Sequence, residues 1–338
     1  MSYDEDMERA WDLLESGDVA GAERLADKLD STDPGNPDVL LLLAACKREG
    51  GAFEEALKLL EEAAQSDPNW ATPELWIAEI LSDDLERLPE ALRHAQAALE
   101  RAEEEDEFLE SLAIKAGLEI DLGKTKAAKE TLAELPPLEA GATLAPEMAR
   151  AFAQLLLEAG EVEQARARYT AIVEADSRDA DAWHGLGLCA EEMEDEDAQR
   201  RAWLHTWDLD SQTPLAHERL SQEQVEELAE SALEELPERA RQLIENVPIL
   251  VVDLPARDEV EKGLDPRLLG LFSGQAYPET ASVGGQPQLT QILLFRKNLE
   301  RVAHDEDDLR EQIRITLLHE TGHFFGMSEE DLGEVGLD

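Results

Sequence analysis

Residues 317–329 read Leu-Leu-His-Glu-Thr-Gly-His-Phe-Phe-Gly-Met-Ser-Glu, and the fold expected for the carboxyl-terminal part of the chain depends on this stretch. Ile313 and Ile315 precede it in an apolar run broken only by polar or small residues, which predicts the end of a helix packed against a core. His319 and His323 are four residues apart, so one face of that helix would carry both imidazoles. Two imidazoles at this spacing can bind one zinc ion. The stretch therefore predicts a metal-binding helix.

Three further residues extend the pattern. Glu320 is offset from His319 by about 100° around the helix axis, where it would flank the metal and take a proton from a water molecule. Gly326 follows the second histidine by three residues, where a helix needs a residue that tolerates positive φ in order to stop. Glu329 comes where the returning chain can offer a third ligand. The whole pattern is H-E-x-x-H-x-x-G-x-x-E, which predicts Glu320 as catalytic and His319, His323 and Glu329 as zinc ligands.

The length and net charge of the chain limit the number of domains and the kinds of partner that we expect. The chain has 338 residues, of which 43% are hydrophobic, enough for two domains or for one domain and a repeat array. Its formal net charge of −49 disfavours nucleic acid and anionic membranes as partners, because such a surface repels phosphates. The charge would suit a basic partner or a high-salt cell interior, but we favour the interpretation that it reflects solvated acidic helix faces.

Other features concern the compartment. No apolar stretch approaches the roughly 20 residues of a membrane span, and residues 1–6 are acidic where a targeting peptide would be basic. Cys46 and Cys189 each lie among apolar residues, which is typical of buried free thiols and not of a disulfide framework. The sequence therefore predicts a soluble, cytoplasmic protein.

The first two thirds of the chain repeat a turn signal. The signal recurs at spacings of 34 to 37 residues, a period that predicts pairs of helices. A second repeat signal has the same period. It consists of two pairs of aspartates whose members are 34 residues apart, and each aspartate would end an amphipathic helix. The turn signals are residues 17–22, 51–56, 86–91, 123–128 and 160–165, and the aspartates are Asp33 with Asp67 and Asp176 with Asp210.

This part of the chain resembles the tetratricopeptide repeats. The unit with the strongest match is Trp-His-Gly-Leu-Gly at residues 183–187, which has the aromatic, leucine and glycine of that family's first helix. Since a single helix pair cannot bury its apolar face, neighbouring pairs would stack into a solenoid with one concave surface. The resemblance implies that this surface binds a protein or peptide partner, or a substrate. The alternative is that the array only packs against its own chain or forms dimers.

The pattern changes after Pro214. Ser221 to Gln224 form a capping box for a new helix, and the motif helix should start around residues 305–308, whose acidic side chains favour a helix amino end. Between them we expect a helical turn at 239–245, strands at 247–253, 268–274 and 289–296, and a Gly- and Pro-rich loop at 274–287 that forms a cleft rim or a plain hairpin connection.

Residues 221–338 resemble the minimal zincin-like metallopeptidase domains, which end soon after an H-E-x-x-H-x-x-G-x-x-[DE] motif. The fold class expected is thus an all-α, tetratricopeptide-like solenoid over residues 1–211, followed by a small α+β zincin-like domain over 221–338. The resemblance implies His319 and His323 as zinc ligands, Glu320 as general base and Glu329 as third ligand. Glu330 or Asp331 are alternatives to Glu329, and Tyr277 and His304 are the candidates for stabilising an oxyanion.

Two functions remain open. In the first, the protein is a zinc-dependent metallopeptidase whose repeats bind a protein partner or substrate. In the second, it is a non-catalytic repeat scaffold with a structural or vestigial metal site. We favour the first, because a structural zinc site has no use for Glu320 and more often employs cysteine.

Overall fold

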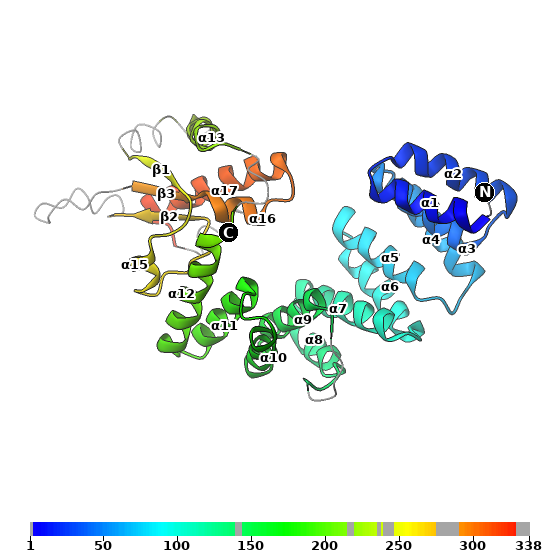
Figure 1. The fold of residues 1–338 in the computed structure, drawn as a ribbon, viewed down its shortest axis with the longest axis horizontal. Helices are drawn as coiled ribbons and strands as arrows, with labels where there is room; N and C mark the ends of the chain where they lie inside the picture. Colours follow the sequence, from blue (N-terminus) through cyan, green and yellow to red (C-terminus); the bar gives the residue numbers. More distant parts are fainter. Residues whose placement is uncertain are drawn as a thin grey trace, which may run out of the picture. The chain divides into compact units, whose positions relative to one another are not determined.

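The computed structural model of the chain describes residues 3–138, 144–214, 220–234, 238, 247–274 and 291–328. It divides into two compact units, Met1–Ala175 and Asp176–Asp338 (Figure 1). The second unit includes the helix pair at 180–212, which the sequence assigns to the repeat array. The functional division into 1–211 and 221–338 stays a prediction. Across the described residues, no helix is both long and apolar enough to cross a membrane.

The first unit consists of antiparallel helix pairs. Each pair packs against the next along the chain, as α2 does on α3, α4 on α5, α6 on α7 and α8 on α9. The predicted all-α repeat architecture is confirmed. Its helices are α1 (Tyr3–Glu15), α2 (Val19–Thr32), α3 (Pro37–Glu49), α4 (Phe53–Ser66), α5 (Thr72–Glu79) with the π-helical turn η1 (Ile80–Asp84), α6 (Leu88–Arg101), α7 (Glu105–Asp121), α8 (Thr125–Leu132), α9 (Pro146–Glu158) and α10 (Val162–Ala175).

The turn within each helix pair has one backbone conformation in common. The repeat signal places glycine there in most pairs, and these glycines have positive φ. Where the signal has Glu86 instead, φ is still positive, at 53°. Glu194 has φ of 56° and closes a further pair that the turn signals do not predict. The glycines are Gly17, Gly51, Gly123 and Gly160.

The second unit begins with the pair α11 (Ala180–Glu192) and α12 (Glu196–Gln212). Asp210 lies in the last turn of α12, which ends at Gln212, close to the predicted helix end; its side chain is buried and ion-paired with Arg267 and Arg301. The remaining elements follow the predicted order, with α15 and α16 added. They are α13 (Gln222–Glu234), β1 (Ile249–Val252), α15 (Arg257–Val260), β2 (Gly270–Ser273), β3 (Gln291–Phe295), α16 (Arg296–Val302) and α17 (Glu306–Phe324).

In the described part of the chain the strands form one sheet, in the order β1-β3-β2. β1 is parallel to β3, and β2 is antiparallel to it. α17 packs on β2 and β3, and α13 packs on β1 and α17 (Figure 1). The core between them includes Val251, Ile292, Leu294 and Leu317. The small α+β part of the predicted fold is therefore confirmed, and its sheet supports the motif helix.

The other features predicted for the chain are a capping box, a helical turn, a loop and two buried free cysteines. The expected capping box is present, because Gln224 N donates to Ser221 Oγ at 3.3 Å and Ser221 N donates to Gln224 Oε1 at 2.9 Å. The helical turn predicted at 239–245 and most of the loop predicted at 274–287 lie outside the described residues. Both cysteines are free and buried, as expected.

Candidate metal centre

The helix α17 presents the motif between two well-formed ends. At its start, Asp305 accepts a hydrogen bond from Asp308 N at 2.8 Å, so the acidic cluster caps the helix as expected. At its end, Gly326 has φ of 79° and donates from its backbone N–H to the carbonyl of His323 at 2.9 Å. Met327 N donates to the carbonyl of Gly322 at 3.1 Å, which completes a Schellman motif. The glycine therefore ends the helix directly after the second histidine.

The two histidines of the motif converge. Their Nε2 atoms lie 3.0 Å apart, close to the about 3.3 Å between two nitrogens bound to one tetrahedral zinc ion. His323 Nδ1 lies 3.3 Å from the carbonyl oxygen of Met327. Since a carbonyl oxygen only accepts, Nδ1 carries the hydrogen and the Nε2 of the neutral ring keeps its lone pair for a metal. The turn that ends α17 thus also sets the tautomer of a candidate ligand.

Glu320 lies on the side of α17 that packs against the sheet. It is 7% exposed, and its Oε2 accepts a hydrogen bond from the backbone N–H of Phe272 in β2. In the antiparallel pair of β2 and β3, Phe295 N donates to the carbonyl of Leu269. Because hydrogen-bonded and non-hydrogen-bonded positions alternate along such a pair, the backbone N–H and C=O groups of Gly270 and Phe272 point away from β3. The outward N–H of Phe272 thereby fixes the carboxylate next to the histidine pair.

Gly270 allows this approach of strand and helix. A Cβ atom at Gly270 would lie 2.7 Å from Thr316 Cγ2 and 3.0 Å from Glu320 Cγ. The rings of Phe272 and Phe324 pack edge to face, with centroids 5.9 Å apart. β2 and α17 are therefore in direct contact along the motif.

Not every residue predicted for the site lies near His319 and His323 in the described part of the chain. His304 precedes α17, and its imidazole is paired with Asp308 at 3.0 Å. It therefore lies roughly 20 Å from His319 along the helix, and its predicted role in stabilising an oxyanion is wrong. Within the described ranges, no cluster of three His, Cys, Asp or Glu side chains could hold a metal. The other candidates, Tyr277, Glu329, Glu330 and Asp331, lie outside the described residues.

Comparison with known families identifies both parts of the chain. Residues 244–337 match the model of the zincin-like metallopeptidases, and two tetratricopeptide-repeat models match residues 13–79 and 150–212. The chain carries tetratricopeptide repeats followed by a zincin-like domain. The zincin-like match runs from before β1 to beyond α17 and so contains the convergent histidines. A search among curated proteins found no match.

Solved structures resemble the repeats. The chain matches the Pseudomonas aeruginosa pilF structure at 20% identity with a TM-score of 0.50, over 62% of this chain and 93% of that one. It matches PilW, described as a widely conserved type IV pilus biogenesis factor, at 16% identity with a TM-score of 0.50, over 62% and 94% of the two chains. At these identities the likeness shows the repeat fold alone.

Sequence reasoning missed the contribution of the sheet to the zincin-like site. Gly270 interrupts the apolar run 268–274, and a glycine within a strand often marks a close approach of another element. That signal could have predicted the contact with α17. The hydrogen bond from Phe272 to Glu320 has no counterpart in sequence, since any residue other than proline offers the same N–H.

Proposed function

We propose that the protein is a zinc-dependent peptidase, with His319 and His323 as ligands and Glu320 as general base. The observation that carries this proposal is the convergence of the two Nε2 atoms, 3.0 Å apart, beside a carboxylate that a backbone N–H holds in place. The donor set fits zinc, which prefers imidazole nitrogen and commonly takes a carboxylate as a further ligand. The resemblance to zincin-like metallopeptidases supports the same conclusion.

When bound, zinc would supply the positive charge that makes water acidic and stabilises an oxyanion. Glu320 would accept a proton from the attacking water and pass it to the departing amine. Its hydrogen bond from the backbone N–H of Phe272 to Oε2 restrains the side chain. A restrained base is in position before the substrate arrives, so little reorganisation is needed during reaction.

The substrate class we propose is an extended peptide. Among the described residues β2 lies at one edge of the sheet, next to the motif helix. The backbone groups of Gly270 that point away from β3 could pair with an extended chain. Glu329 is our proposed third ligand, with Glu330 or Asp331 as alternatives.

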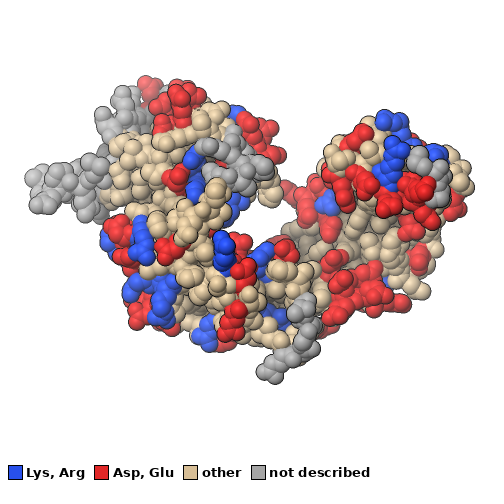
Figure 2. Space-filling view, viewed as in Figure 1, with Lys and Arg blue, Asp and Glu red and all other residues tan. Residues whose placement is uncertain are grey.

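For the repeats we propose binding of a protein or peptide on the concave face of the array, which would recruit a partner or substrate. On the face shown in Figure 2, acidic side chains predominate over α1 to α7. A cytoplasmic location is part of the proposal, and the buried free thiols are compatible with it.

The first experiment measures zinc by elemental analysis in the wild type, His323→Ala and Glu320→Gln. We expect about one zinc per chain in the wild type and in Glu320→Gln, and none in His323→Ala. A peptide library should then be cleaved by the wild type, with a loss of at least about 100-fold in kcat for Glu320→Gln.

A wild type that binds no zinc even after zinc is added back would overturn the proposal, and the scaffold function would replace it. Zinc binding with equal turnover in wild type and Glu320→Gln would exclude Glu320 as the base. His304→Ala serves as the control variant, because this histidine lies at the far end of α17 and should affect neither measurement.

A further inference from the structure

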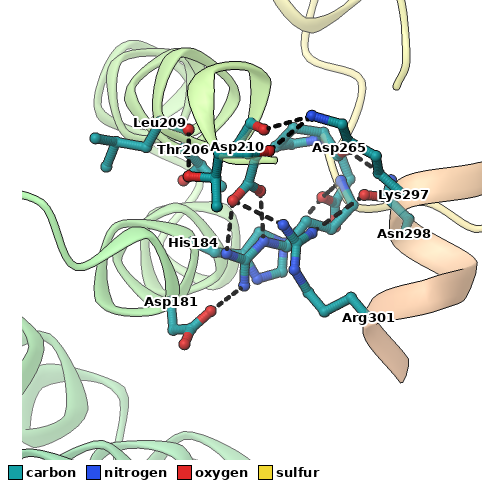
Figure 3. A network of polar contacts seen from close by, with 12 residues as sticks. Asp181, His184, Thr206, Leu209, Asp210, Asp265, Lys297, Asn298 and Arg301 are labelled. Atoms are coloured by element: carbon teal, nitrogen blue, oxygen red, sulfur yellow. Dashed lines mark hydrogen bonds and ion pairs between the residues drawn. The ribbon is translucent and has the colours of Figure 1, made fainter. Parts of the chain in front are cut away.

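A buried carboxylate joins the last repeat helix to the zincin-like domain. Asp210 in α12 is 4% exposed. Its Oδ2 accepts from Arg267 Nε at 3.1 Å, and its Oδ1 pairs with Arg301 Nη2 at 2.7 Å. Figure 3 shows these groups converging, with Arg301 supplied by α16. One carboxylate thus binds two guanidinium groups that lie outside its own helix pair.

The other helix of this pair, α11, also contacts the segment around Arg267. Arg267 Nη1 pairs with Asp181 in α11 at 2.8 Å. Asp265 Oδ1 lies 2.9 Å from His184 Nε2 and accepts from Arg267 N at 2.8 Å (Figure 3). We call Asp181, His184, Asp210, Asp265, Arg267, Asn298 and Arg301 the Asp210 network. Both α11 and α12 therefore contribute to fixing Arg267.

The network requires Asp210. Burial, together with the neighbouring Arg267 guanidinium, lowers the pKa of Arg301 from its ordinary value. Two cations this close repel each other in a poorly solvated site, and a carboxylate between them offsets that repulsion. Without Asp210 the two guanidinium groups would separate, and each would carry its attached segment with it.

Asn298 connects the network to the backbone before β2. Arg301 Nη1 donates to Asn298 Oδ1 at 3.1 Å, which orients the amide. Asn298 Nδ2 in turn donates to the carbonyls of Pro266 at 2.9 Å and Leu268 at 2.7 Å. Asn298 is 1% exposed, so water cannot replace these bonds. The backbone on both sides of Arg267 is therefore fixed.

The fixed segment leads directly to the candidate site. The chain enters β2 at Gly270, two residues after Leu268. Phe272 of the same strand donates to Glu320, and Gly270 lies against the Glu320 side chain. A shift of residues 266–268 would therefore move the donor that restrains Glu320.

We propose that Asp210, in the last repeat helix, is a positioning residue for Glu320, acting through Arg267, Arg301 and Asn298 on strand β2. The inference rests on the proposed function for its effect on turnover. It makes the pair α11–α12 part of the peptidase unit, beyond any role in binding partners.

The test uses the full chain and two readouts. The variants are Asp210→Asn, Arg301→Lys, and the control Asp208→Asn, which removes an exposed charge from the same helix. The first readout is the amide resonance of Phe272, with Glu320→Gln as the reference for loss of the charge-assisted bond. We expect this resonance to move towards its position in Glu320→Gln in the first two variants, and to stay unchanged in Asp208→Asn.

The second readout is turnover. A displaced base should lower kcat by about tenfold or more with KM nearly unchanged, while zinc content stays at the wild-type level. Arg301→Lys retains the positive charge beside Asp210 but loses the donor to Asn298, so it provides a second, milder test if Asp210→Asn fails to fold. A Phe272 resonance at its wild-type position in Arg301→Lys, with wild-type kcat, would overturn the proposal. If the wild type binds no zinc and cleaves nothing, the proposed function fails, and the Phe272 resonance still decides whether Asp210 positions β2.

Discussion

The Nε2 atoms of His319 and His323 lie 3.0 Å apart, and the Nδ1 of His323 is held by the carbonyl oxygen of Met327. The second contact directs the lone pair of His323 Nε2 towards His319, so the pair is preorganised before any metal binds. Binding would then need little rearrangement of α17.

Zinc should therefore stabilise the folded protein. With free zinc at 100 times its dissociation constant, the expected gain is about 2.7 kcal/mol, which corresponds to a rise in Tm of about 5 °C. Thermal unfolding with zinc and with a chelator would measure it. His319→Ala should show no difference between the two conditions, and an equal shift in this variant would exclude the site.

Replacement of the proposed third ligand should weaken zinc binding. We expect Glu329→Gln to reduce zinc affinity by at least about 100-fold, more than the loss of an outer contact produces. Asp331→Asn and Glu330→Gln are the matched controls, expected to bind zinc as the wild type does. A competition titration with a chromophoric chelator gives the affinities, and a large loss in one of the controls instead would assign the third ligand to that residue.

Gly270→Ala should disturb the site and the fold together. The new Cβ would lie 2.7 Å from Thr316 Cγ2 and 3.2 Å from Glu320 Oε1, so β2 and α17 must separate. Overpacking of this kind costs about 1–3 kcal/mol in the free energy of unfolding. We expect both the midpoint of urea denaturation and the rate of peptide turnover to be lower than in the wild type. Unchanged turnover would show that Glu320 does not depend on contact with β2.

Gly187→Ala should destabilise the last helix pair. A Cβ atom there would lie 2.0 Å from the buried ring of Trp203, which has no room to move aside. We expect a loss of about 3 kcal/mol in the free energy of unfolding. Gly117→Ala is the control within a helix, because its Cβ would meet only Leu155 at 3.7 Å. That variant should gain about 0.5–1 kcal/mol from helix propensity, and equal losses in both would contradict the packing argument.

Stability should depend on pH through Glu74. This carboxylate is 8% exposed, and hydrogen bonds from His94 and Arg101 lower its pKa below 4.5. A group whose folded pKa is lowered stabilises the native state above its unfolded pKa, and this contribution disappears as pH falls through the folded value.

Glu74→Gln should accordingly cost about 1–3 kcal/mol at pH 7, and the difference from wild type should shrink at the acid end of the range. Urea unfolding at a series of pH values measures it. The exposed Glu61→Gln in α4 is the control, expected to match wild type throughout. A constant difference for Glu74→Gln at every pH would assign the loss to packing.

The repeats were predictable because their signals are local. The turn at Glu86 was found from its spacing to the neighbouring turns, although it lacks glycine, and its φ is positive like theirs. The turn at Glu194 lacks glycine too and was not among the predicted turns. The repeated aspartate at Asp210 does lie in the last turn of α12, but its ion pairs with Arg267 and Arg301 could not be predicted, because these residues are far along the chain.

The helix pairs, the capping of α17, and the common face of His319 and His323 are all encoded locally, because each depends on residues a few positions apart. The hydrogen bond from Phe272 to Glu320 and the ion pair of Asp210 with Arg267 depend instead on how distant segments pack. These contacts join residues 48 and 57 positions apart. They arise because β2 packs on α17 and the helix pair α11–α12 packs on the segment before β2. No periodicity along the chain encodes this packing.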